Sequence, residues 1–232
     1  DATRELINRK FKGAKGLNIG NYELYHVENG ATVAMTYVAS EAELDEYYNT
    51  YYARVKYVMF LKNIKYVYND AGKPESYASM VEEVIKSAGR IDVLVNNFGT
   101  SNPGKDLDFS NTDTDVFLDT VNINLRSVFM GSKEAVKYMA KQGGGSIVNI
   151  SSVGGLVPDI SQVAYGTSKA AINYLTKLIA VQEAKHHIRC NAVLPGMTAT
   201  EAVEKHLSDD FRNLFMKHIP LSRMGLPEEI AE

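Results

Sequence analysis

The sequence has 232 residues, of which 45% are hydrophobic and 23% are charged, an ordinary composition for one globular α/β domain. The formal net charge of -3 gives no electrostatic reason to expect a nucleic acid partner. The only cysteine, Cys190, excludes an intrachain disulfide, no apolar run approaches the roughly 20 residues that span a bilayer, and no secretory signal is visible. We therefore expect a cytoplasmic protein with no membrane partner.

The hydrophobic pattern predicts alternating strands and helices. In chain order they are strand Ala31–Tyr37, helix 41–54, strand Lys65–Tyr68, helix 77–87, strand 91–95, helix 115–141, strand 146–150, helix 164–185 and strand 188–194. Residues 77–87 carry apolar side chains at helical spacing, and Gly89 follows as expected of a helix C-cap. The run 91–95 is apolar throughout, as in a strand buried on both faces. Glycines at 143–145 end the long helix.

This alternation predicts a parallel sheet covered by helices on both faces, the doubly wound α/β fold. No linker or repeat is visible, so residues 1–232 are expected to form a single domain. Ligands of such sheets bind at the carboxyl ends of the strands. Polar or turn residues follow three of the predicted strands, namely Asn96 and Asn97, Ser151 and Ser152, and Pro195 and Gly196.

Tyr165 and Lys169 lie four residues apart on a predicted helix, so both side chains project from one face. A phenol with a pKa of about 10 is a poor acid or base at neutral pH, and a nearby ammonium lowers that pKa. General acid/base work favours a pKa near the operating pH, so the pair can form a catalytic unit. The motif is short, and a surface helix with one tyrosine and one lysine explains it equally well.

Two further side chains favour the catalytic interpretation. Ser152 stands at the end of a predicted strand, where its hydroxyl can hydrogen-bond a carbonyl oxygen that Tyr165 also contacts. The alternative is a serine that caps the next segment. Asn124 lies on the long predicted helix, where a buried amide can fix a backbone carbonyl or a water chain, whereas an exposed one is only solvated.

The order and spacing of these residues resemble the short-chain dehydrogenase/reductase family. The resemblance runs from about residue 65 to the end, on the motifs Asn96-Asn97-Phe98-Gly99, Asn124, Ser152, Tyr165, Lys169 and Pro195-Gly196-Met197-Thr198-Ala199-Thr200. It implies a Rossmann-like fold, a nicotinamide cofactor and no metal.

The family's catalytic roles carry over to the matching positions. The resemblance implies that Tyr165 exchanges a proton with the substrate oxygen and that Ser152 orients that oxygen. It implies that Lys169 lowers the pKa of Tyr165 and holds the nicotinamide ribose. It also implies that Asn124 supports a proton relay through water and Lys169.

The resemblance further implies a set of cofactor contacts besides Tyr165 and Lys169. They are Gly13, Gly16, Gly20, Thr36, Asp70, Asn96, Gly99, Pro195, Gly196, Thr198 and Thr200. Asn96 and Gly99 would line the adenosine, Asp70 the adenine and Thr200 the nicotinamide end. At the end of the second strand an acidic residue selects NAD and an arginine accommodates NADP. Residues 36–40 hold neither, which together with the subgroup resemblance favours NADP and leaves NAD open.

The N-terminal third fits the family less well. Residues 5–12 are too charged for a buried central strand, and the glycines at 13, 16 and 20 carry one residue more than the family's phosphate-binding motif. Residues 21–29 are polar and tyrosine-rich where the resemblance implies an apolar helix face. Either this unit has diverged or the natural sequence differs here, and the failure of local rules favours the second explanation. The resemblance also implies a further helix and a last strand beyond residue 232.

Several short sequence segments narrow the resemblance to the bacterial 7α-hydroxysteroid dehydrogenases, which act on bile acids. The matching segments are 144–152, 157–161, 188–196, 209–212 and 218–221. A partly apolar lid is expected over residues 197–215, which suits a steroid or an acyl chain, so a 3-oxoacyl-[acyl-carrier-protein] reductase is the alternative. A catalytically silent nucleotide-binding scaffold is disfavoured because Ser152, Tyr165 and Lys169 are all intact.

The two long helices carry apolar residues beyond one inward stripe, and exposed apolar faces usually mark an interface. These residues are Val128, Phe129 and Tyr138 on 115–141, and Ile172, Leu175 and Ile179 on 164–185. The resemblance implies that the helices pair into a four-helix contact, so we expect a homodimer or homotetramer.

Overall fold

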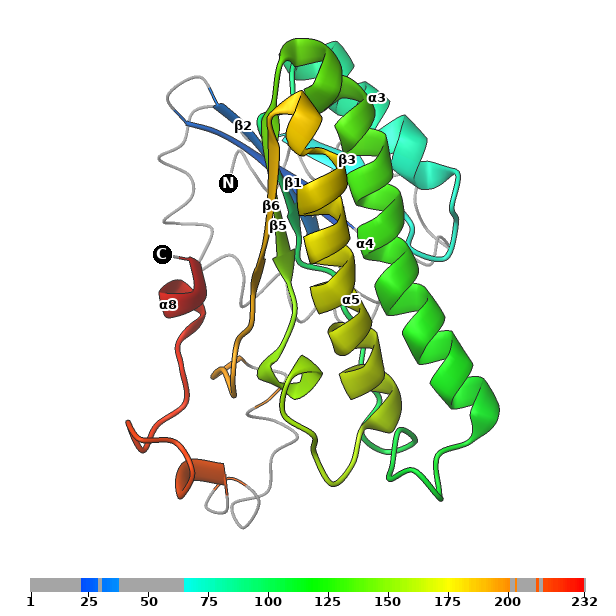
Figure 1. Ribbon diagram of the computed structural model, residues 1–232, viewed down its shortest axis with the longest axis vertical. Coiled ribbons are helices and arrows are strands. Elements are labelled where there is room, and N and C mark those ends of the chain that lie inside the picture. Colours follow the sequence, from blue (N-terminus) through cyan, green and yellow to red (C-terminus); the bar gives the residue numbers. More distant parts are fainter. Residues whose placement is uncertain are drawn as a thin grey trace, which may run out of the picture.

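A six-stranded sheet organises the part of the chain that the computed structural model describes, residues 22–28, 31–37, 65–200, 203, 212 and 215–231 (Figure 1). The strands pair in the order β3-β1-β2-β4-β5-β6. They are β1 Tyr22–Glu28, β2 Ala31–Tyr37, β3 Lys65–Tyr68, β4 Val93–Asn96, β5 Gly145–Ile150 and β6 Ile188–Val193. Neighbours from β2 to β6 are parallel, which confirms the predicted Rossmann-like α/β fold.

One part of the sheet differs from the expected parallel arrangement. β1 runs antiparallel to both β2 and β3, so a strand forms where the family resemblance implied a helix. The sequence between β1 and β2 is Asn29-Gly30, the pair that most often joins two hairpin strands because both residues tolerate positive φ. β2 coincides with the predicted strand. The predicted helix 41–54 and the charged segment 5–12 lie outside the described residues.

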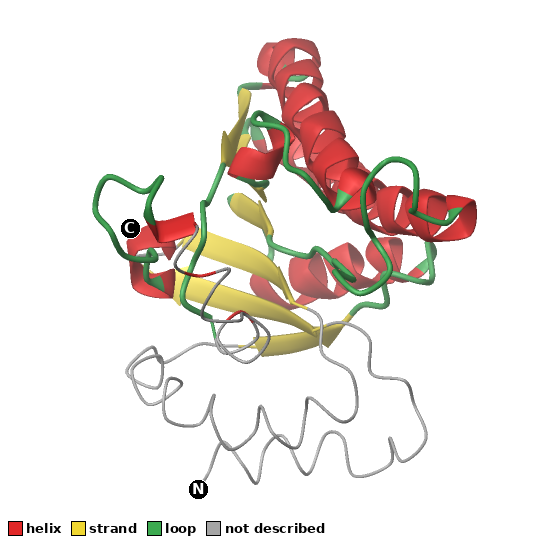
Figure 2. Cartoon of the chain, turned by 90° about the horizontal axis from the view of Figure 1, so that it is seen from below, coloured by secondary structure: helices red, strands yellow, loops and turns green. Residues whose placement is uncertain are grey.

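Three helices lie side by side on one face of the sheet (Figures 1 and 2). They are α3 Ser76–Ala88, α4 Thr114–Gln142 and α5 Val163–Gln182, close to the predicted bounds. The C-caps Gly89 and Gly143 adopt φ of 79° and 93°, the left-handed region that favours glycine, so both predicted helix ends are confirmed. Shorter elements are η1 Val153–Gly155, η2 Ala184–His186 and α8 Pro227–Ala231.

The core lies between the sheet and this helical layer. Its fully buried members include Leu94, Ile147 and Ile188 from the strands and Met80, Val84, Ala135 and Met139 from the helices. Burying each of the large side chains contributes roughly 1.5–3 kcal/mol relative to exposure. This packing holds β4, β5 and β6 in register. The N-terminal parts of α4 and α5 extend beyond the carboxyl ends of these strands (Figure 1).

Two residues that were expected at an interface belong to this interior. Val128 and Ile172 are 1% and 0% exposed, because α4 and α5 each bury one face on the sheet and another on the neighbouring helix. Tyr138 and Ile179 pack against the core as well. Of the named set, Phe129 is the one left largely exposed, at 47%.

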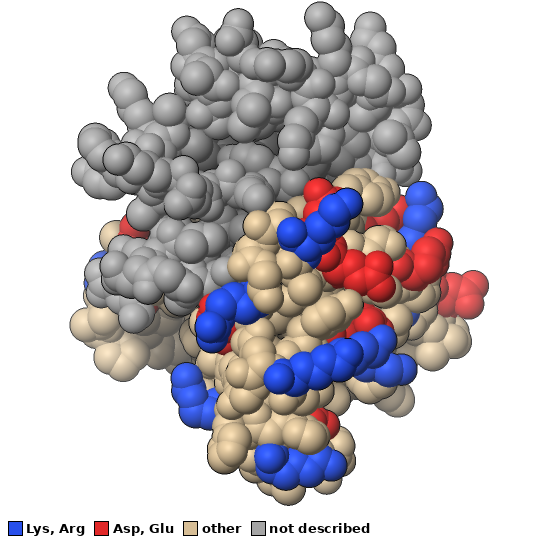
Figure 3. Space-filling view, turned by 90° about the horizontal axis from the view of Figure 1, so that it is seen from above, with Lys and Arg blue, Asp and Glu red and all other residues tan. Residues whose placement is uncertain are grey.

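The described surface at the upper end of the molecule mixes both signs of charge. Figure 3 shows lysine and arginine side chains interspersed with acidic ones there, with no large area of one sign on the described part of that face. No described helix has both the length and the apolar character needed to cross a membrane.

Candidate active site

The segments that follow β4, β5 and β6 meet at one edge of the sheet, as the sequence predicts. The Ser151 amide donates to the Val193 carbonyl at 2.8 Å, and the Val153 amide donates to the Pro195 carbonyl at 3.0 Å. Backbone bonds therefore hold the ends of β5 and β6 together just where the predicted catalytic serine stands.

Ser152 caps η1 and also contacts Tyr165. Its Oγ accepts a hydrogen bond from the Gly154 amide at 3.1 Å, so Ser152 does cap the segment that follows it, which was the alternative interpretation. The same hydroxyl forms a side-chain hydrogen bond with Tyr165. The two predicted catalytic hydroxyls are thus brought together by η1 and the first turn of α5.

Burial raises the pKa of Tyr165, and the hydrogen bond with Ser152 opposes that rise only in part. This differs from the expectation that the neighbouring ammonium would lower it. The Lys169 Nζ lies 5.5 Å from the centroid of the Tyr165 ring and donates to the Ile150 carbonyl at 2.9 Å. Tyr165 therefore holds its phenolic proton at neutral pH.

Lys169 is 4% exposed, and this burial lowers the pKa of its ammonium to about 8. Gly99, another predicted contact, borders the same group, because a Cβ there would lie 3.0 Å from the Lys169 Nζ. The glycine after β4 thus leaves room for a buried cation beside Tyr165. A buried, weakly held proton next to a phenol is typical of a functional site.

The Lys169 pKa predicts an unusual pH dependence of stability. The unfolded chain keeps the Lys169 proton up to its usual pKa of 10.5, while the folded chain releases it near 8. The unfolded state binds more protons in this window, so stability rises with pH. The free energy of unfolding of wild type relative to Lys169→Met should increase by about 3 kcal/mol between pH 7 and 10.5.

Urea unfolding of both ligand-free chains across this pH range measures the effect, and taking the difference removes the titration of every group that both share. The bond to Ile150 is lost at every pH in the variant and does not change the slope. A difference that stays flat or falls with pH would show that the folded Lys169 has no lowered pKa.

Asn124 is fully buried, which excludes the alternative of a merely solvated residue. Its Oδ1 accepts from the Thr100 amide at 2.8 Å, and its Nδ2 donates to the Thr100 carbonyl at 3.0 Å and to the Ser168 Oγ at 3.0 Å. Ser168 in turn donates to the Tyr165 carbonyl at 2.7 Å. Asn124 therefore joins the segment after β4 to the helix that carries Tyr165. Its role in a proton relay stays a prediction.

The residues at this edge fit the nicotinamide-ribose end of a dinucleotide. A Cβ added at Gly196 would meet nothing within 4 Å, so the backbone there borders open space next to Pro195. The Thr198 Oγ1 donates to the Gly196 carbonyl at 3.2 Å, and the Thr200 Oγ1 accepts from the Val203 amide at 3.3 Å. An ammonium, two hydroxyls and an open glycine backbone can supply hydrogen-bond donors and acceptors to a ribose and a carboxamide.

Apart from Asn96 and Gly99, the remaining predicted cofactor contacts divide into three groups. Asp70 follows β3 and stays partly exposed, with its carboxylate accepting from the Gly72 amide at 2.8 Å and lying 3.4 Å from the Lys73 Nζ. Thr36 lies on β2, where its backbone pairs with Glu23. The predicted glycines at 13, 16 and 20 lie outside the described residues.

The Asn96 side chain is 2% exposed and points into the interior, so the predicted contact of Asn96 with the adenosine stays a prediction for its backbone alone. The Nδ2 donates to the Ser132 Oγ at 3.0 Å and to the Asn149 Oδ1 at 2.8 Å, so it braces β4 against β5 and α4. Its side chain cannot line the adenosine. The sequence contained a sign of this burial. Side chains alternate between the two faces of a strand, so Asn96 shares a face with the core residue Leu94.

Two residues near the site were not singled out from the sequence. Asp106 is fully buried in the segment before α4, and its carboxylate accepts from the backbone amides of Ala164 and Tyr165. Gly155 ends η1 against α5, where a Cβ would lie 2.7 Å from the Lys169 carbonyl carbon and 2.9 Å from the Ala170 nitrogen. Neither residue stands in a recognisable local pattern.

The family model described as enoyl-(acyl carrier protein) reductase matches residues 24–232. The chain is 51% identical to a 7α-hydroxysteroid dehydrogenase of Clostridium sardiniense over 167 residues, which cover 72% of this chain and 64% of that protein. It is 42% identical to a 3-oxoacyl-[acyl-carrier-protein] reductase of Thermotoga maritima over 153 residues, 66% of this chain and 61% of that protein.

A solved structure of a related protein has a similar fold. A putative short-chain alcohol dehydrogenase from Sinorhizobium meliloti superposes with a TM-score of 0.65 and 30% identity, over 71% of this chain and 64% of that one. The matches therefore span less than two thirds of the length of these relatives.

Proposed function

Because the chain belongs to the short-chain dehydrogenase/reductase family, we propose that it is an oxidoreductase acting on a secondary alcohol or ketone with a nicotinamide cofactor. The observation that carries this proposal is the cluster of Ser152, Tyr165 and Lys169, in which one hydroxyl contacts the phenol and a buried ammonium lies over its ring.

The residues divide the chemistry among them. A bound nicotinamide cofactor, held in part by Lys169, would supply the hydride chemistry at the substrate carbon. Tyr165 donates its proton to the ketone oxygen in reduction, and its raised pKa keeps that proton available at neutral pH. In oxidation the deprotonated phenol takes the proton of the alcohol, and the raised pKa makes that form less populated at neutral pH. The Ser152 hydroxyl orients the same oxygen. Lys169 holds the ribose and supplies positive charge beside the phenol.

The substrate that we propose is the 7α-hydroxyl of a bile acid. Beside the resemblance to the clostridial enzyme, the loop between Ser152 and α5 presents apolar side chains to solvent, with Leu156, Val157 and Ile160 exposed by 69%, 65% and 80%. A rigid steroid loses little conformational entropy when it binds an apolar cleft, so such side chains suit it. The lid expected over 197–215 lies mostly outside the described residues.

A panel of four bile acids tests this proposal. Cholic and chenodeoxycholic acids carry a 7α-hydroxyl and should reduce the cofactor. Deoxycholic acid lacks that hydroxyl and ursodeoxycholic acid has the opposite configuration, so both should be silent. Activity on deoxycholic acid would move the reaction to another carbon of the steroid. Running each assay with NADP and with NAD tests the preference for NADP, which rests on the absence of an acidic residue at 36–40.

Reduction of a 3-oxoacyl thioester is the second candidate, because the Thermotoga relative is named for that reaction and an acyl chain suits the same apolar loop. Silence with all four bile acids and activity on acetoacetyl thioester would favour it over the steroid.

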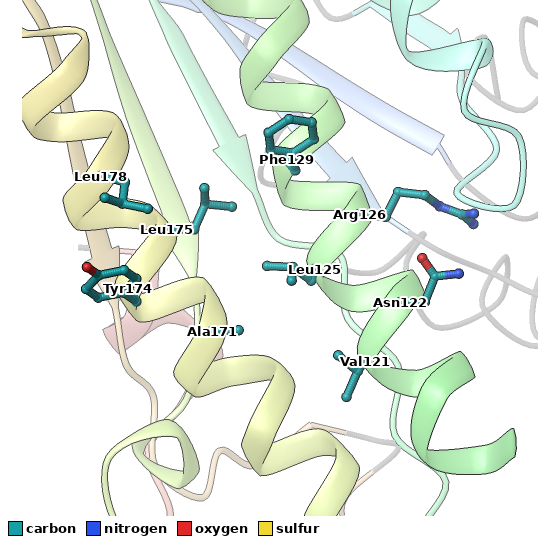
Figure 4. Close-up of a pocket in the computed structure, with 9 residues that line it drawn as sticks. All are labelled: Val121, Asn122, Leu125, Arg126, Phe129, Ala171, Tyr174, Leu175 and Leu178. Carbon is teal, nitrogen blue, oxygen red and sulfur yellow. The ribbon is translucent and has the colours of Figure 1, made fainter. Parts of the chain in front are cut away.

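We also propose that a second copy of this chain covers the outer face of α4 and α5. A groove of about 510 Å³ lies between these helices, and Figure 4 shows the side chains of both helices that line it. Those lining side chains are Val121, Asn122, Leu125, Arg126, Phe129, Ala171, Tyr174, Leu175 and Leu178. Phe129 and Tyr174 are 47% and 63% exposed in the single chain, and apolar surface of this kind is usually covered by a partner.

Light scattering at micromolar concentration should therefore give a dimer or tetramer. Replacing both Tyr174 and Leu178 by aspartate places two charges in the groove and should shift the protein to monomers. Phe109→Asp is the matched control, because Phe109 is 88% exposed on the loop before α4 and lines no part of the groove. A monomeric wild-type protein would contradict the proposed assembly.

A further inference from the structure

The helix that carries Tyr165 begins without a cap of its own. Its N-cap residue, Gln162, adopts a left-handed φ of 58° and makes no side-chain capping bond. A side-chain cap requires extended backbone at that position, and the first amides of any helix lack partners within it. The first backbone amides of α5 therefore need hydrogen-bond partners from outside the helix.

Segment 106–107, nearly sixty residues earlier in the sequence, supplies every one of these partners. The Asp106 carbonyl accepts from the Gln162 amide at 3.2 Å, and the Leu107 carbonyl accepts from the Val163 amide at 3.2 Å. The Asp106 carboxylate then accepts from the Ala164 amide at 2.9 Å and from the Tyr165 amide at 2.8 Å. Both oxygens of a fully buried carboxylate are thus committed to the first turn of α5.

We propose that Asp106 is the positioning residue for Tyr165, an inference that rests on the proposed function of Tyr165 as proton donor. Asp106 caps α5 from outside the helix and fixes the backbone of Tyr165 itself. The opposite side of the site is held by η1, whose Ser152 contacts the phenol. Asp106 therefore sets how far the phenol stands from Ser152 and from the reacting oxygen.

The chemistry of the carboxylate suits this task. Two backbone amides point at one group, and an ionised carboxylate can accept both bonds while its charge interacts favourably with the helix N-terminus. An asparagine can accept only one of them and turns an N–H donor toward the other. Because a misplacement of about 1 Å can cost about a hundredfold in rate, the effect of losing these bonds should appear in turnover.

The test measures kcat of the full chain with chenodeoxycholic acid and NADP, and with acetoacetyl-CoA and NADPH. Asp106→Ala should lower kcat by roughly ten- to a hundredfold. The kcat of Asp106→Asn should lie between those of the alanine variant and wild type. This variant replaces Asp106→Ala in the test if the alanine variant does not fold. Asp113→Ala is the matched control, since Asp113 also accepts from two backbone amides, those of Asp115 and Val116, but caps α4. It should lose stability with little change in kcat.

A double mutant separates positioning from general stability. If Asp106 acts through the phenol, adding Asp106→Ala to Tyr165→Phe should lower the residual kcat by less than about twofold. A full additional loss of kcat in the double mutant, or wild-type kcat in both Asp106 variants, would overturn the positioning role while the proposed function stands. A wild-type chain inactive on both substrates, or an active Tyr165→Phe, would overturn the proposed function and this inference with it.

Discussion

Replacing Tyr165 by phenylalanine is expected to lower turnover by about 10²- to 10⁴-fold, the range that a general acid contributes. The change keeps the ring and removes the hydroxyl that contacts Ser152. The Lys169 ammonium faces the ring and bonds the Ile150 carbonyl, and neither contact needs the hydroxyl. Cofactor affinity should therefore persist while proton transfer fails. Steady-state kinetics and a fluorescence titration of NADPH measure the two quantities separately.

Tyr138→Phe is the control for loss of a hydroxyl, because Tyr138 lies near the far end of α4 beside Lys141. It should retain full turnover. A Tyr165→Phe protein that keeps more than about a tenth of wild-type turnover would rule out the phenol as the main proton donor.

Replacing Asn149 by leucine is expected to destabilise the fold by about 2–4 kcal/mol, because it removes one buried hydrogen bond from Asn96 and one from Thr176. The Asn149 Oδ1 accepts from the Asn96 Nδ2, and its own Nδ2 donates to the Thr176 Oγ1, both at 2.8 Å. This fully buried amide joins β4, β5 and α5. At about 2–4 °C per kcal/mol for a chain of this size, the midpoint of thermal unfolding should fall by about 5–15 °C.

Thr176→Val provides a graded comparison, because it removes one end of this network and leaves the bond between Asn96 and Asn149 intact. We expect about half the loss of the leucine variant. Scanning calorimetry measures both. A leucine variant as stable as wild type would mean that apolar packing replaces the buried amide at no cost.

The sequence predicted the regular part of the fold well, because long periodic segments and glycine caps carry strong local signals. The bounds of α4 and α5 fell within a few residues of those predicted, and Gly89 and Gly143 end their helices as expected. The strand Tyr22–Glu28 was missed, although Asn29-Gly30 follows it directly in the sequence. There the family resemblance outweighed a local hairpin signal.

The site was predictable only where spacing carries chemistry. Ser152, Tyr165 and Lys169 lie together as their motif implies, whereas the raised pKa of Tyr165 depends on a degree of burial that no motif encodes. Asp106 illustrates the other limit. Its role arises from a contact between segments nearly sixty residues apart, and one of three aspartates in the loop before α4 gives no sign of it.

The tight approach of Gly155 to α5 has a consequence for how such an enzyme can evolve. Because the backbones of η1 and α5 touch there, the loop that leaves η1 starts from a fixed point. The exposed side chains of Leu156, Val157 and Ile160 can then be exchanged for others without moving Ser152 relative to Tyr165. On the proposed function, mutations in this loop would change substrate preference, whereas the arrangement of Ser152 and Tyr165 would be kept by Gly155, where a side chain would collide with the backbone of α5.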